Sequence, residues 1–343
     1  MPTKSSLSKF RKKISYRFFK KEFESLIGRY EAYRKTFKGY YIYAIDGDEL
    51  VMPRSKELLA LGYRSNRVKE NKESWYLKNY IVHTYDVVNR VSKAVTFSAN
   101  QNELAGAKKM IPKLESNSIT LYDRLYFCRP LVATHRDAGN KFIARLKSND
   151  SSVKYMNARS KRYHRSVVEG VEVHTHKIKN KKTGGYLYLA TNLARGEFLK
   201  KELAQLYLRR WEVETSFRDS TETLQQSKLH SKTENEILQE VYAHYWLINH
   251  SKVQLALADQ SDLTMWLNKE YRRSSLKMVY ECIIDSFKQL VMGQTRGVIR
   301  RMLEIIRRTQ EKRKHLSRSA PRKMRAAGRK GYNYNGVTER NNA

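Results

Sequence analysis

The sequence predicts a mixed α/β fold with a central sheet, flanking helices and basic helical segments near both ends. Short apolar runs rich in aromatic and β-branched residues alternate with segments of helical periodicity. A stretch of alternating apolar and polar residues with a Gly-containing turn lies mid-chain. Lysine and arginine are concentrated in the flanks.

The charge of the chain indicates a polyanionic partner. Its 343 residues contain 68 Lys and Arg against 34 Asp and Glu, a formal net charge of +34. Excess lysine can simply keep a surface soluble, but a charge this large favours nucleic acid, because neutralised phosphates release condensed counterions. Charge alone does not distinguish an enzyme from a DNA-binding module.

Several classes are excluded by simple patterns. No run of about 18 apolar residues occurs and no apolar segment follows the basic N-terminus, so neither a membrane span nor a secretory signal is expected. Cys128 and Cys282 stand far apart, which excludes a disulfide framework and a CxxC-type zinc site. We therefore expect the protein to stay in the cytoplasm.

The first part of the chain predicts an arm followed by strands. Met1 to Lys38 holds twelve Lys and Arg and three Glu, with apolar residues in a helical rhythm. Tyr40 to Ile45 (YYIYAI) predicts a buried strand that ends in a turn at Asp46-Gly47-Asp48. Trp75 to Asp86 and Arg90 to Phe97 predict a hairpin. A helix is expected from Asn100 to about Leu114.

Two further strands complete the central sheet. Ser118 to Tyr122 (SITLY) ends at Asp123, a helix is expected from about Tyr126, and Lys141 to Leu146 (KFIARL) is the fifth strand. Three strands, a helix, a strand, a helix and a strand follow one another in the order of an RNase H-like domain. The fold class predicted is therefore an RNase H-like mixed sheet with flanking helices.

The second half predicts a β-rich insertion and then helices. Alternation between Lys147 and Arg195 (VEVHTHKIKN, KKTGG, YLYLATNL) indicates a β-hairpin. Gly196 to His230 is helical throughout by periodicity, and more helix is expected from Glu234 to Arg308. The expected divisions are a basic N-terminal arm, a first part of the core, the insertion, a helical second part of the core and a basic tail: residues 1–39, 40–147, 148–197, 198–308 and 309–343.

Three carboxylates in this framework suggest phosphodiester chemistry. Asp46 and Asp123 each follow an apolar strand, and Glu214 lies on the long helix. Cleavage without a covalent intermediate needs two divalent cations about 4 Å apart, and hard oxygen ligands suit Mg²⁺. Taken singly, an Asp-Gly after a strand is usually a turn and a helical Glu is usually solvated. Their order and the neighbours of Glu214 favour a site.

One face of the predicted helix carries three of these neighbours. Tyr207, Arg210, Glu214 and position 221 lie within an arc of about 60°. Arg210 could hold a phosphate with its planar guanidinium while Glu214 holds a metal. The alternative is a surface ion pair between Arg210 and Glu214 at i, i+4.

These residues resemble a known family. The segment from Tyr207 through Arg210, Trp211 and Glu214 is similar to the Y-x2-R-x3-E-x6-K signature of the DDE transposases of bacterial insertion sequences. AIDGDEL around Asp46 resembles the first-Asp motif of the family, and LYDRLYF around Asp123 resembles the second. KFIARLKS and YLATNL resemble the strands that follow, so the resemblance covers about residues 40–247.

The resemblance implies a function and its partners. It implies binding of terminal inverted repeats and target DNA, metal-dependent strand cleavage and strand transfer, two Mg²⁺ ions that Mn²⁺ can replace, and a dimer in the DNA complex. It also implies a bacterial protein that associates with the nucleoid when bound to DNA. Asp46, Asp123 and Glu214 would be the catalytic metal ligands. The residues expected to contact DNA are Arg124, Tyr207, Arg210, Trp211, Arg218 and Lys228.

One departure from the signature leaves alternatives open. Thr221 stands where the family has lysine. Arg218, at i+4 from Glu214, could supply the cation on the same face, whereas Lys228 is separated from Glu214 by about 21 Å of helix. A catalytically impaired descendant that only binds DNA is therefore the alternative function. The arm before Tyr40 is also short for a family that usually carries a separate end-binding domain, so the element is either compact or truncated at its start.

Two other classes are less well supported by the residues. An RNA-binding module would be expected to show an aromatic RNP motif, a GXXG loop or a zinc knuckle, and none is present. A recombinase with Tyr207 as covalent nucleophile would need Arg and His residues clustered around it, which the sequence does not indicate.

Overall fold

The computed structural model describes most of the chain and all eight strands of its main sheet. The described residues are 3–63, 67–69, 72–73, 76–98, 102–179, 184–218, 229, 231–259, 270–273, 276–293, 296–309 and 311–314.

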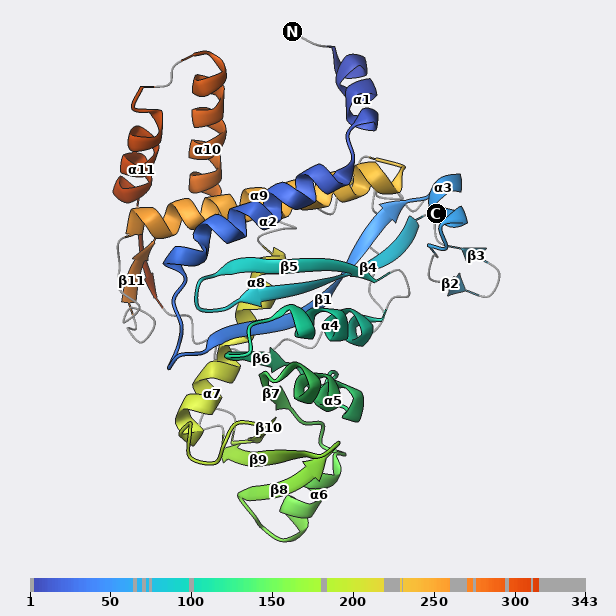
Figure 1. Ribbon diagram of the computed structural model, residues 1–343, viewed down its shortest axis with the longest axis vertical. Coiled ribbons are helices and arrows are strands. Elements are labelled where there is room, and N and C mark those ends of the chain that lie inside the picture. Colours follow the sequence, from blue (N-terminus) through green and yellow to red (C-terminus); the bar gives the residue numbers. More distant parts are fainter. Residues whose placement is uncertain are drawn as a thin grey trace, which may run out of the picture.

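An eight-stranded mixed sheet forms the centre of the molecule (Figure 1). Its strands, in chain order, are β1 (Tyr41–Pro53), β4 (Tyr76–Asp86), β5 (Val91–Ser98), β6 (Ser118–Tyr122), β7 (Lys141–Arg145), β8 (Tyr163–Val168), β9 (Val171–Lys179) and β10 (Tyr186–Thr191). The spatial order is β5-β4-β1-β6-β7-β10-β9-β8. Strands β1, β6 and β7 are parallel, and β4 is antiparallel to both of its neighbours, β1 and β5. This arrangement confirms the predicted mixed sheet of RNase H-like order.

Strand β1 is longer than the sequence predicts. The prediction of a turn at Asp46-Gly47-Asp48 is wrong, because the strand continues to Pro53. Strand β4 pairs with β1 along nearly its whole length, from Tyr43 opposite Asp86 to Pro53 opposite Tyr76, so the Asp-Gly-Asp backbone keeps its hydrogen-bond partners. Only the parallel pairing with β6 ends early, at Ala44.

Helices cover both faces of the sheet (Figure 1). On one face α4 (Glu103–Met110), η2 (Ile111–Lys113) and α5 (Arg129–Ala138) bury a core that includes Tyr43, Ile45 and Tyr122. On the other face α7 (Lys200–Arg209) and α8 (Trp211–Arg218) bury Ile42 and Ala44. Alternate residues of β1 thus face opposite helical layers, as a strand buried on both sides requires.

The predicted insertion is larger than a hairpin. Strand β8 and helix α6 (Ser151–Ala158) accompany the expected pair β9 and β10. Strand β10 pairs with β7, so all three strands extend the main sheet. Sequence alternation was too weak to show β8 because its residues are half-buried or exposed.

The predicted single helix from Gly196 to His230 is wrong. Helix α7 ends at Arg209 and α8 begins at Trp211. Around Arg210 the bonds span three residues, since its N–H donates to Tyr207 and its carbonyl accepts from Val213. The local sequence has no Gly or Pro, so periodicity could not show this break.

The N-terminal arm packs onto the core. It forms α1 (Lys4–Lys13), α2 (Tyr16–Tyr30) and η1 (Glu31–Tyr33). Helix α2 lies alongside α9 (Glu234–Asp259) in Figure 1, and Phe23 of α2 is buried in a core with Tyr242 and Tyr245 of α9. The arm is therefore helical, as predicted, and its apolar residues are part of a shared core.

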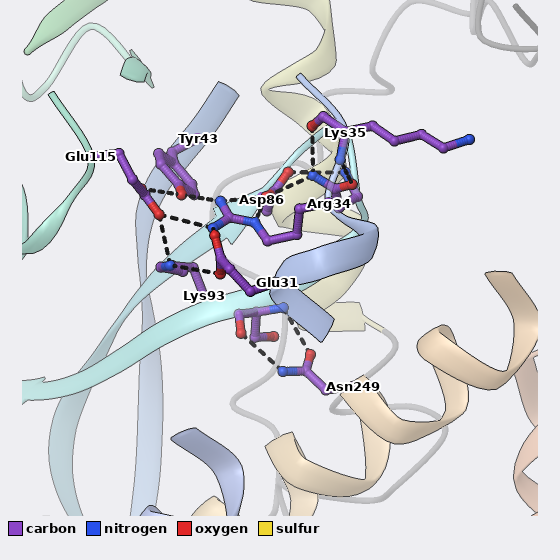
Figure 2. Close-up of polar contacts among 10 residues, drawn as sticks. Glu31, Arg34, Lys35, Tyr43, Asp86, Lys93, Glu115 and Asn249 are labelled. Atoms are coloured by element: carbon purple, nitrogen blue, oxygen red, sulfur yellow. Dashed lines mark hydrogen bonds and ion pairs between the residues drawn. The ribbon is translucent and has the colours of Figure 1, made fainter. Parts of the chain in front are cut away.

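Arg34 fastens the end of this arm to the sheet (Figure 2). Its guanidinium is fully buried and donates to Asp86, with Nη2 3.1 Å from Oδ2, and to Glu115, with Nη1 2.8 Å from Oε1. Tyr43 accepts a further bond from Arg34. Lys93 joins the cluster through Glu115 at 2.8 Å. A buried arginine costs little only when its donors are satisfied, as here.

The C-terminal region is not continuous helix as predicted. After α9, a short strand β11 (Glu270–Arg273) pairs with β12 (Glu311–Lys314) of the expected tail. Between them, α10 (Leu276–Val291) and α11 (Val298–Arg308) pack together and project from α9 (Figure 1). Short elements outside the main sheet are α3 (Lys56–Ala60), β2 (Arg67–Lys69) and β3 (Lys72–Glu73). Among the described helices, none is long and apolar enough to cross a bilayer.

Candidate active site

Strand register places Asp46 level with Asp123. Strands β1 and β6 pair in parallel up to Ala44 opposite Leu121. Parallel strands advance equally, so two more residues along each strand bring Asp46 beside Asp123. Asp46 is two residues after Ala44, so its side chain lies on the same face of β1 as that of Ala44, the face toward α7 and α8. Asp46 thus lies on β1, and Asp123 directly follows the end of the neighbouring strand β6, on the side of the sheet that α7 and α8 cover.

Arg210 connects Asp46 to Glu214. Its Nη1 lies 3.2 Å from Oδ2 of Asp46, and its Nη2 lies 2.6 Å from Oε1 of Glu214. Arg210 stands at the break between α7 and α8, and only 9% of its side chain is exposed. The ion pair between Arg210 and Glu214 at i, i+4, which the sequence analysis gave as the alternative, is therefore present. Asp46 is a third member of this group, and the group faces the sheet. Two of the three predicted carboxylates meet on one guanidinium.

The surroundings of Asp46 oppose its ionisation. Burial raises the pKa of Asp46 to about 6, and the nearby carboxylates of Glu103 and Glu214 act in the same direction. Arg210 and the backbone N–H of Gly47 act in the opposite direction. A carboxylate in such a place is stabilised by any added cation.

Tyr207 and Arg145 lie next to this group. Tyr207 of α7 is buried, and burial raises the pKa of its phenol. Asp123 raises that pKa further, whereas Arg210 and Arg145 lower it, so all three lie close to the ring. A raised pKa makes the phenolate scarcer, which gives no support to Tyr207 as a covalent nucleophile.

Glu103 is a fourth carboxylate that the sequence prediction missed. It begins α4, directly after the N-cap Asn102. Its side chain passes over Gly47, where an added Cβ would lie 2.5 Å from Glu103 Cγ. Its Oε2 accepts a bond from the Tyr126 hydroxyl at 3.0 Å. The sequence signal was the Asn-Glu pair typical of a helix start, but nothing local linked it to Asp46.

His83 lies between the sheet and α8, next to Asp46. It lies opposite Asp46 in the β1–β4 pairing and is fully buried. Its ring packs edge-on against Phe217 of α8, with centroids 5.4 Å apart. Burial lowers the pKa of His83 to about 3, so the imidazole is neutral. This neutral contact helps to hold α8, and with it Glu214, against the sheet.

The other predicted DNA-contacting residues lie around this group or outside the described part. Arg124 is exposed in the turn after β6, one residue beyond Asp123. Trp211 begins α8 and is 40% exposed. The side chain of Arg218 and the whole of Thr221 and Lys228 lie outside the described residues.

The donor set suits a divalent cation, although its side chains are arranged around Arg210. Within the described residues, no three metal-binding side chains converge closely enough to hold one ion. The carboxylate oxygens of Asp46 and Glu214 are hard donors of the kind that Mg²⁺ prefers, but both are turned to the guanidinium. The guanidinium thus provides the positive charge between them.

Sequence comparison assigns the chain to a family. Residues 37–250 match the family described as Transposase DDE domain, and this range is more than half of the chain. The chain belongs to the DDE transposase family. The matched range starts before β1 and ends in α9, so it contains Asp46, Asp123 and Glu214. The resemblance noted over residues 40–247 is confirmed at the level of the family.

A distant structural likeness accompanies this DDE transposase match. The cryo-EM structure of a piggyBac transposase synaptic complex with hairpin DNA is similar at 14% identity and a TM-score of 0.44. The likeness covers 78% of this chain and 57% of that chain, so this chain spans little more than half of its length. No curated protein matches the chain in sequence. DDE transposases generally use divalent metal ions.

Proposed function

We propose that the chain binds the terminal inverted repeats of an insertion sequence and catalyses metal-dependent cleavage and strand transfer of DNA. The observation that carries this proposal is the meeting of Asp46 and Glu214 on Arg210, with Asp123 level with Asp46 in the parallel register. Three carboxylates brought together from three distant segments would repel one another unless cations neutralised their charge.

In this proposal Asp46, Asp123 and Glu214 hold two Mg²⁺ ions. When bound, the ions supply activation of the attacking oxygen and neutralise charge at the leaving oxygen. Arg210 would leave the carboxylates and bind a DNA phosphate with its planar guanidinium. Tyr207 and Arg145 would position the strand next to the cut, since Asp123 and Arg145 both act electrostatically on the Tyr207 phenol. Arg124, exposed in the turn after Asp123, would contact the backbone.

The basic flanks, Met1 to Lys38 and Arg296 to Lys330, would supply much of the DNA affinity through phosphate contacts. Deleting the arm would expose the core that Phe23 shares with α9. Neutral substitutions at exposed lysines therefore test the flanks better than truncation. We also propose that two copies act together on DNA, since each carries one site and an element has two ends.

A cleavage assay tests the function. With a duplex carrying the element's own ends, cleavage should require Mg²⁺ or Mn²⁺. Asp46→Asn, Asp123→Asn and Glu214→Gln should each lower it by about three orders of magnitude, or about 4 kcal/mol of transition-state stabilisation. Glu212→Gln is the matched control, because Glu212 lies on the same helix but pairs with Arg209 and Arg90. Equal activity of triad and control variants would refute the assignment.

The second candidate function is that of an impaired descendant that binds DNA without cutting it. Thr221 in place of the signature lysine is the observation in its favour. Wild-type protein that bound the repeats tightly, yet left them uncut with Mg²⁺ and with Mn²⁺, would support this candidate.

A further inference from the structure

A basic and aromatic surface is formed by side chains of α6, β9 and β10 near the edge of the sheet that ends with β8. Helix α6 lies beside β8 at this edge (Figure 1). We call it the α6 surface. It is formed by Tyr155, Asn157, Arg159, Lys161, Lys177 and Tyr186. None of these residues belongs to the carboxylate site described above.

Two positively charged side chains lie close to the ring of Tyr155. The Cζ of Arg159 lies 4.4 Å from the ring centroid, and the Nζ of Lys161 lies 5.5 Å from it. Lys161 also approaches the Tyr155 hydroxyl at 3.4 Å. The imidazole of His164, on β8, packs on the same ring with centroids 4.4 Å apart. Aromatic contact fixes these cations in place but does not neutralise them.

Lys177 extends the same surface onto β9 and β10. Its Nζ lies 4.4 Å from the centroid of Tyr186 and 5.6 Å from that of Tyr188. Asn157 of α6 accepts bonds from Lys177 at 2.7 Å and from the Tyr188 hydroxyl at 2.5 Å. This amide therefore joins the helix to the strands, so that Lys177 and the Tyr155 cluster form one surface.

Among the residues that the structure describes, the cations of the α6 surface lack acidic partners. In the described part of the chain, no carboxylate lies within ion-pair distance of Arg159, Lys161 or Lys177. Nearby arginines differ, since Arg129 pairs with Glu169 at 2.5 Å and Arg165 with Glu172 at 3.7 Å. Clustered like charges destabilise the surface that carries them, and an external anion removes this cost.

We propose that the α6 surface binds the phosphate backbone of duplex DNA leading away from the cleavage site. Arg159 and Lys177 lie over the rings of Tyr155 and Tyr186, in positions that stacked bases occupy in single-strand binders, so the surface favours duplex. Strand β9 lies four strand spacings, about 19 Å, from β1, which corresponds to about six base-pair rises. This inference rests on the proposed function for the DNA substrate, but its chemistry is phosphate recognition.

Salt-dependent binding to a random-sequence duplex tests the surface. Arg159→Gln/Lys161→Gln/Lys177→Gln should weaken binding by at least about tenfold and lower the slope of log affinity against log salt by up to about 2.7, or about 0.9 for each lost phosphate contact. The matched control is Lys108→Gln/Lys109→Gln/Lys113→Gln, which removes the same charge from exposed positions on α4 and η2. An unchanged slope relative to this control would overturn the proposal.

Further measurements keep the result decisive. If the triple variant fails to fold, Arg159→Glu, at one exposed position, should still weaken binding by several-fold. Stronger competition by single-stranded DNA or RNA than by duplex would also overturn the proposal. The proposed function fails separately. Wild-type protein that cuts no DNA, but whose duplex binding depends on the α6 surface, would refute catalysis and leave this inference intact.

Discussion

Arg210 and Asp46 are joined across 164 positions of the chain, with Nη1 of the arginine 3.2 Å from Oδ2 of the aspartate. The same guanidinium binds Glu214 one helical turn farther on. One cation therefore holds together the strand and the helix that carry two of the candidate ligands. The break between α7 and α8 at Arg210 turns its side chain toward the sheet.

Removing the guanidinium should make the fold depend on divalent ions. In Arg210→Ala, Asp46 and Glu214 would face each other with Glu103 nearby, and the protein should lose about 2 kcal/mol of stability without metal. Mg²⁺ should restore more of the thermal midpoint in this variant than in wild type. Arg209→Ala, which removes the neighbouring pair with Glu212, is the control. Identical Mg²⁺ responses in both variants would contradict this role.

Gly47 and Glu103 should be coupled. A Cβ at position 47 would lie 2.5 Å from Glu103 Cγ, so Gly47→Ala must displace Glu103 and break its bond to Tyr126. We expect a cost of about 1–3 kcal/mol in urea unfolding. In a Glu103→Ala background the same substitution should cost much less. Additive costs in this double-mutant cycle would mean that the two residues are independent.

The Arg34 cluster predicts a specific acid sensitivity. Burial opposes ionisation of Glu115, but bonds from Arg34, Lys93 and Tyr43 lower its pKa from 4.5 to about 2. A lowered pKa stabilises the fold above pH 4.5, and this contribution disappears as the pH falls toward 2. The free energy of unfolding of wild type should therefore exceed that of Glu115→Gln by about 2 kcal/mol at neutral pH, a figure reduced for the partial exposure of Glu115.

The comparison is made by urea unfolding from neutral pH down to about 3. Glu169→Gln is the control, because Glu169 pairs with the exposed Arg129. A difference between wild type and Glu115→Gln that stayed constant across this range would show that Glu115 is not held ionised by the cluster.

Thr221 gives a prediction that separates compensation from decay. If Arg218 replaces the signature lysine, wild type should cut its ends, Arg218→Ala should lose orders of magnitude, and Thr221→Lys should change little. If the protein is a decayed copy, wild type should be nearly inactive and Thr221→Lys should restore cleavage. Active wild type that is indifferent to both substitutions would remove the need for a cation at this point.

The central strands β6 and β7 were predictable because they are largely buried and form short apolar runs in the sequence. SITLY and KFIARL are such runs, and both strands lie where expected. The sequence predicts too short a strand β1 because Asp-Gly-Asp resembles a turn. The pairing with β4 shows that this segment is strand. Strand β8 alternates weakly and was missed.

The candidate site was only partly predictable for a similar reason. Motif order led to Asp46, Asp123 and Glu214, because each lies in a recognisable local segment. Glu103 and His83 lie beside them only through the packing of α4 and the register of β4, which involve residues distant in sequence. The break at Arg210 likewise coincides with a long-range ion pair, the one between Arg210 and Asp46.

The location of bound manganese tests the central claim most directly. Crystals of the protein with its terminal repeat, soaked in Mn²⁺, should show anomalous density bounded by the carboxylates of Asp46, Asp123 and Glu214, with Arg210 turned to a phosphate. Metal–oxygen distances should be about 2.0–2.6 Å. Manganese bound elsewhere, in crystals of a complex that cleaves its DNA, would contradict the account.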